Sequence, residues 1–104
     1  MATTTKALAR TAAATSNTTL YTVPNTSTTT IVTSILVANT AASAGTFTLN
    51  IDGVAICSGT SIGANATTVI DLKQVIPANA TPKTITGSAS ATTINFHISG
   101  VEIS

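Results

Sequence analysis

Few side chains in this sequence suit catalysis or metal binding. Leaving hydroxyl groups aside, the candidates are Asp52, Asp71, Glu102, His97 and Cys57. Asp52 precedes Gly53, and this dipeptide is favoured in the two-residue turn of a β-hairpin, so turn chemistry accounts for its carboxylate. Cys57 ends the apolar run GVAIC, where a free cysteine behaves as a small hydrophobic residue. With one cysteine, the chain has no internal disulfide.

The remaining candidates match no motif. Lys73 lies two residues from Asp71 on the same strand face, which predicts a weak ion pair. A divalent cation would fit Asp71, His97 and Glu102 only if the fold brought them together, because their spacing matches no ligand pattern. The glycine-rich segment SGTSIGAN precedes no lysine, so it is not a phosphate loop. We therefore expect no catalytic residue, no cofactor and no metal, and hence no enzyme.

The charge content excludes several partners. Only 7% of residues are charged and the net charge is +1. The cations Lys6, Arg10, Lys73 and Lys83 are scattered, whereas binding to nucleic acid needs clustered cations. Aromatic residues make up 3% of the chain, too few for base-stacking platforms. No apolar run is long enough to predict a membrane-spanning helix. We expect neither nucleic acid nor membrane as a partner.

Threonine dominates the composition, with 24 occurrences. Threonine and other β-branched residues fit a pleated surface, which favours an all-β fold with a hydroxyl-rich, weakly charged exterior. Such a surface gains little solubility from charge repulsion. We interpret it as a surface that another protein covers. The alternative is a β-domain that uses threonine where other domains use lysine and glutamate.

Alternation and turn signals divide residues 19–104 into about seven or eight short strands, which predicts a single antiparallel β-sandwich, jelly-roll or immunoglobulin-like. Residues 1–18 carry no strand pattern and are expected to form an extended, flexible N-terminal arm. The predicted core is Ile35, Phe47, Leu49, Ile51, Ile70, Leu72, Phe96 and Ile98. A subunit interface is predicted at Val32, Leu36, His97, Val101 and Ile103.

The C-terminal run raises the question of what it pairs with. We expect Thr92 to Ile98 to pair within its own sandwich, with Phe96 meeting Phe47 in the core. Gly100 is then expected to let the chain turn. That turn would leave residues 101–104 at a sheet edge near a symmetry partner.

Several segments resemble small β-sandwich virion proteins of tailed bacteriophages. The resemblance covers about residues 18–104 and rests on LYTVP, TTIVTSILVANT, TFTLNIDG, ANATTVIDL and INFHISGVEI. It implies a structural protein that assembles symmetrically, often as a homotrimer, on a capsid or tail. Its implied partners are further copies of itself and the major capsid protein or another virion protein, and its implied location is the virion.

Three kinds of role stay open, and the resemblance does not separate the first two. We favour a capsid decoration (cement) protein whose arm contacts the shell through Lys6, Leu8 and Arg10. A tail, baseplate or fibre component, including a host-adhesion module using loops 40–46 and 58–66, is the alternative. Aromatic residues are absent from those loops, which disfavours receptor binding. A third hypothesis is a metal-stabilised binding domain built on the Asp71, His97 and Glu102 set.

Overall fold

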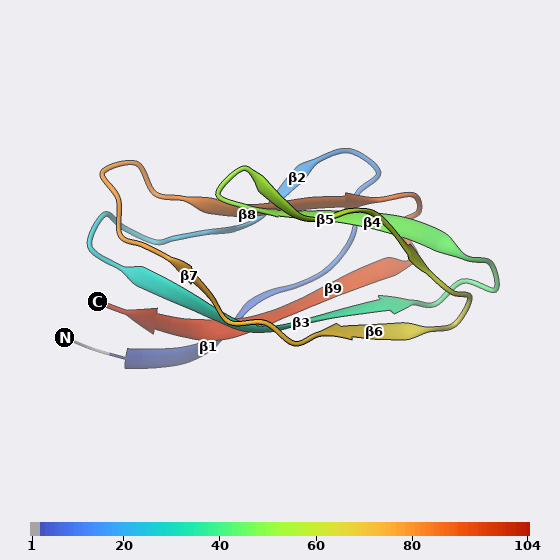
Figure 1. Ribbon diagram of the computed structural model, residues 1–104, viewed down its shortest axis with the longest axis horizontal. Coiled ribbons are helices and arrows are strands. Elements are labelled where there is room, and N and C mark those ends of the chain that lie inside the picture. Colours follow the sequence, from blue (N-terminus) through green and yellow to red (C-terminus); the bar gives the residue numbers. More distant parts are fainter. Residues whose placement is uncertain (1–2) are drawn as a thin grey trace.

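Two antiparallel sheets pack face to face in the computed structural model, which describes residues 3–104 (Figure 1). The predicted all-β sandwich is confirmed, with nine strands in this part of the chain. The strands are β1 (Thr3–Ala12), β2 (Thr18–Thr22), β3 (Thr29–Asn39), β4 (Gly45–Ile51), β5 (Val54–Ile62), β6 (Thr67–Ile70), β7 (Gln74–Ile76), β8 (Thr84–Ala89) and β9 (Ile94–Ile103).

The chain passes back and forth between the two layers, with β4 and β5 consecutive in one sheet and β6 and β7 consecutive in the other. One sheet has the order β1-β9-β3, with β6 and β7 pairing one after the other along the free edge of β3. The other sheet has the order β2-β8-β4-β5. We call these the five-stranded and the four-stranded sheet. Both the first and the last described strand belong to the five-stranded sheet, where they lie side by side with Thr3 paired to Ile103 (Figure 1).

The expected N-terminal arm is largely a strand of the sandwich. Residues 3–12 form β1, which pairs antiparallel with β9 along its whole length. The prediction of an arm separate from the fold is therefore wrong for these residues, while residues 1–2 lie outside the described part of the chain. Leu8 is the one buried side chain of β1 and packs into the core. The other residues of β1 are exposed or half-buried, so the sequence shows no alternation of apolar and polar residues.

The core lies between the sheets and is almost entirely aliphatic. Phe47 of β4 and Phe96 of β9 meet across it edge to face, with ring centroids 6.3 Å apart. This contact joins the two sheets. Six of the eight predicted core residues are buried, whereas Ile70 and Leu72 are half-buried and pack against the core from the β6–β7 edge.

The hairpin between β4 and β5 has the turn that the sequence predicts. Asp52 and Gly53 both have positive φ, 55° and 74°, as a two-residue type I′ turn requires. Asp52 also forms an ion pair with Lys83, with Oδ1 and Nζ 3.3 Å apart. Glycine suits the second position because it has no Cβ to oppose a positive φ.

A β-bulge in β3 reverses the predicted orientation of its first half. Thr33 has no partner in the register with β9, which shifts between Val32 and Ser34. The extra residue changes the alternation, so Val32 points into the core and Ile31 points outward. The prediction that Val32 belongs to a subunit interface is therefore wrong, because its side chain is fully buried.

β9 does not end at Gly100 and does not lie at an edge. It continues to Ile103 and pairs with β1 on one side and β3 on the other. The prediction of a turn at Gly100, with residues 101–104 at a sheet edge, is therefore wrong. A Cβ at this position would overlap the carbonyl oxygen of Ile31 and lie 2.8 Å from Cδ1 of Leu8. The glycine is thus needed for close packing between neighbouring strands and not for a change of direction.

Candidate protein–protein interface

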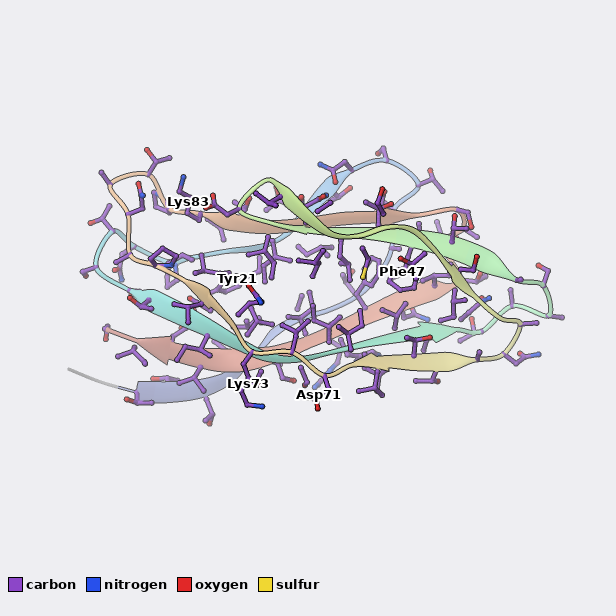
Figure 2. The ribbon with its side chains drawn as sticks, in the orientation of Figure 1. Tyr21, Phe47, Asp71, Lys73 and Lys83 are labelled. Carbon is purple, nitrogen blue, oxygen red and sulfur yellow. The ribbon has the colours of Figure 1, made fainter. Side chains whose placement is uncertain are left out.

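The fold does not bring together Asp71, His97 and Glu102, the residues considered as metal ligands. His97 lies on the outer face of the five-stranded sheet, whereas the Glu102 side chain points between the sheets. Asp71 lies between β6 and β7, and Figure 2 shows that it points away from the core, as does Lys73. Residues 3–104 contain no group of three potential metal ligands and no cavity. Within that range Asp71 and Lys73 form no ion pair, unlike the predicted weak pairing.

Glu102 belongs to a polar cluster between the two sheets. Its carboxylate accepts hydrogen bonds from the hydroxyl of Tyr21 and, at 3.3 Å, from Nζ of Lys6. The Tyr21 oxygen lies 2.8 Å from Oγ1 of buried Thr30. Burial, reinforced by the hydrogen bond to Glu102, raises the pKa of Tyr21 to about 12. The cluster links β2, β3, β9 and β1 and serves the fold.

The outer face of the five-stranded sheet carries apolar side chains in rows. The register aligns Thr5 of β1, Val101 of β9, Ile31 of β3 and Val75 of β7 across the sheet. Residues in one row point to the same side of a sheet. Because Gly100 and Val32 in the next row are buried, the row that contains Val101 faces outward.

A second outward row crosses the other half of the same sheet. It contains Arg10 of β1, His97 of β9, Leu36 of β3 and Val69 of β6. Arg10 is the one permanently charged side chain in the two rows. Val69 is 63% exposed and Val75 is 59% exposed. Large apolar side chains this exposed on a regular strand mark a surface suited to contact with another protein.

We call the outward side chains of these two rows, together with Ile103, the apolar face. Its charged groups lie at the margins: Arg10, at the end of the second row, is on edge strand β1, and Asp71 and Lys73 lie beside the face at the β6–β7 edge (Figure 2). An apolar centre with a polar rim is the usual anatomy of a protein–protein interface.

Four of the five predicted interface residues lie together on the apolar face: Leu36, His97, Val101 and Ile103. Three further residues of the apolar face, Ile31, Val69 and Val75, are not among the predicted interface residues. The alternation around Ile70 placed Val69 on the outward side, and this was a signal for it. Ile31 was hidden by the bulge at Thr33, and β7 is only three residues long, too short to show a period.

Two of the three residues predicted to contact the capsid shell are engaged within the fold. Leu8 is buried in the core, and Lys6 pairs with Glu102. Arg10 is exposed at the edge of the apolar face. One of the two predicted adhesion loops is shorter than expected, because residues 58–62 of the 58–66 segment belong to β5.

Comparisons with known proteins give a fold likeness and no family. No family model and no curated protein matches the chain. Among solved structures, it is similar to a chain of the T13 IBDV viral particle, with 12% identity and a TM-score of 0.53 over 97% of this chain. A chain of the infectious bursal disease virus Gt strain gives 12% identity and a TM-score of 0.50, also over 97%.

The present chain spans only about a third of those viral chains, 30% and 32% of their lengths. At this identity the likeness shows a shared sandwich fold. In the part of the chain that the structure describes, no helix is long and apolar enough to cross a membrane.

Proposed function

We propose that the protein is a non-enzymatic structural subunit of a virus particle. The observation that carries the proposal is the apolar face, an outward sheet surface with a row of apolar side chains at Val101, Ile31 and Val75. The fold likeness to chains of viral particles supports the same class. The low charge content adds support, because a weakly charged surface is easily desolvated when it is covered.

The finer proposal is a capsid decoration, or cement, protein of a tailed bacteriophage that assembles as a homotrimer on the shell. A small rigid sandwich with one apolar face can be repeated at many equivalent shell sites. Weak contacts then add through symmetry, since each further contact forms at high effective concentration. The partners in this proposal are other copies of the chain and the major capsid protein.

The alternative is a component of the tail, baseplate or fibre. The same apolar face would then mediate stacking or connection, with fewer copies per particle. The exposed loops offer little for host recognition, because Tyr21, Phe47 and Phe96 are all buried. Interface hot spots are enriched in aromatic residues, so the loops favour a role in assembly over one in receptor binding.

Immunogold labelling of the virus particles produced with this protein tests both levels of the proposal. Antibodies against the purified full chain should label intact particles over the whole shell. Labelling confined to the tail would select the alternative. If washed particles carry no label, and peptides of the chain are also absent from them by mass spectrometry, the structural role is wrong. A non-structural protein of the same lysate serves as the negative control.

A further inference from the structure

The first strand is joined to the sandwich in a way that does not require it to come from the same chain. β1 is an edge strand that pairs only with β9. Its single buried side chain is Leu8, and Ala9 is half-buried, while the other residues are exposed. An edge strand that contributes so little to its own core can leave it at lower cost than a central strand.

The site that β1 occupies is nevertheless specific. Gly100 leaves room for Leu8, because a Cβ on residue 100 would lie 2.8 Å from Cδ1 of Leu8. Leu8 is the extra residue where the register of β1 shifts between Ala7 and Ala9, and both Leu8 and Ala9 pack against the core at this bulge. Side-chain packing therefore fixes the register of the strand at one point.

A charge fixes the same register at a second point. The Glu102 side chain is only 12% exposed, and Lys6 supplies the cation that balances it at 3.3 Å. Without β1, that carboxylate would keep the Tyr21 hydroxyl but lose its ion pair. The free edge of β9 thus selects an extended segment with a lysine two residues before a leucine, in addition to offering a backbone ladder.

The link from β1 to the rest of the chain allows exchange. Ala13 donates to the Ile94 carbonyl at 2.8 Å, and Ala89 donates to the Ala14 carbonyl at 2.9 Å. These bonds can move with the strand into a neighbouring subunit. The next three residues, 15–17, are exposed and lie outside the strands, which makes them a suitable hinge.

We infer that β1 is exchanged between neighbouring copies of this chain in the assembled state. Residues 3–14 of one copy occupy the β9 edge of the next, with Leu8 against Gly100 and Lys6 beside Glu102. The contacts are the same in the closed and exchanged forms, so exchange requires only that copies be held side by side. This inference rests on the proposed function, since a particle surface supplies those neighbours at high effective concentration.

Paired cysteines test the inference on the full chain. In a Cys57→Ser background, Thr5→Cys with Val101→Cys joins β1 to β9. The matched control, Ile31→Cys with Val101→Cys, joins β3 to β9 in the same row. Each protein is unfolded, refolded at high concentration, oxidised, and run on a denaturing gel without reductant.

We expect covalent oligomers from the β1–β9 pair and covalently closed monomers from the β3–β9 control. Monomers from both pairs at every concentration would overturn the inference, and so would oligomers from both, because the bonding would then be unspecific. If the first pair does not oxidise, Thr3→Cys with Ile103→Cys replaces it, with Thr29→Cys and Ile103→Cys as control. Immunogold labelling of particles is unaffected by this result, so failure of exchange and failure of the proposed function are distinguishable.

Discussion

The two outer faces of the sandwich are built from the same kind of strands and yet differ in chemistry. On the central strands of the four-stranded sheet, β4 and β8, the outward positions hold hydroxyl and amide groups such as Thr46, Asn50 and Thr86. Some of these bond to each other, as Asn50 Nδ2 does to Oγ1 of Thr86 at 3.3 Å. On the five-stranded sheet the equivalent positions hold Ile31 and Val101. The exposed large apolar side chains of the four-stranded sheet, Val54 and Ile56, lie on its edge strand β5.

The difference shows which side of the molecule is suited to being covered. Threonine satisfies both β-propensity and contact with water, so the polar outer face needs no partner. Isoleucine and valine have the same propensity, but they leave apolar surface in water. The central strands β3 and β9 of the five-stranded sheet carry aliphatic residues at outward positions where β4 and β8 carry threonine and asparagine, and this difference supports assembly through the apolar face.

The largest expected loss of stability comes from the core that the two sheets share. Phe96→Ala should lower the free energy of unfolding by about 3–5 kcal/mol, because it removes a fully buried ring. Chemical denaturation monitored by circular dichroism measures the change. Val69→Ala, at an exposed position, is the control and should change it by less than about 0.5 kcal/mol. A loss below about 1 kcal/mol for Phe96→Ala would mean that Phe96 is not in the core.

A smaller loss is expected where β9 meets its neighbours beneath the apolar face. Gly100→Ala should cost about 1–3 kcal/mol, because the added Cβ overlaps the Ile31 carbonyl and the Leu8 side chain. Gly63→Ala is the matched control, since its Cβ would meet only Ala66, at 3.7 Å. Thermal unfolding of both variants checks this. Equal melting temperatures for the two would show that the strands are not packed this closely.

A pH-dependent loss should be confined to alkaline conditions. The pKa of Tyr21 is raised from 10.0 to about 12, so folding favours its protonated form. This contribution to stability is complete below pH 10 and is lost as the pH rises toward about 12. Denaturation midpoints measured across that interval should fall more steeply for the native protein than for Tyr21→Phe. Parallel curves would contradict the placement of the hydroxyl beside Glu102.

The parts of the fold that could be predicted from the sequence are those with an unbroken period. Phe47, Leu49 and Ile51 alternate without interruption before Asp52-Gly53, and the structure forms that hairpin. Regular alternation also placed Phe96 in the core opposite Phe47.

The errors arise where the period is interrupted or has too few apolar members. The bulge at Thr33 reverses the faces of β3, so Val32 lies inside and Ile31 outside. β1 has one buried side chain and therefore resembles an unstructured arm. The pattern around Gly100 predicts a turn, whereas the glycine allows a close contact between strands, and a single sequence does not separate these two uses of glycine.

The most direct measurement is the molar mass in solution, by size-exclusion chromatography with light scattering, of three full-length proteins. These are the native chain, Val69→Lys with Val75→Lys on the apolar face, and Thr19→Lys with Thr46→Lys on the opposite sheet. All four positions are exposed, so the two variants add equal charge without disturbing the core. The account predicts a native oligomer, unchanged in the threonine variant and dissociated to monomer in the valine variant. An oligomer that the threonine variant dissociates, or that survives both changes, would contradict the assignment of the apolar face, as would a monomeric native chain.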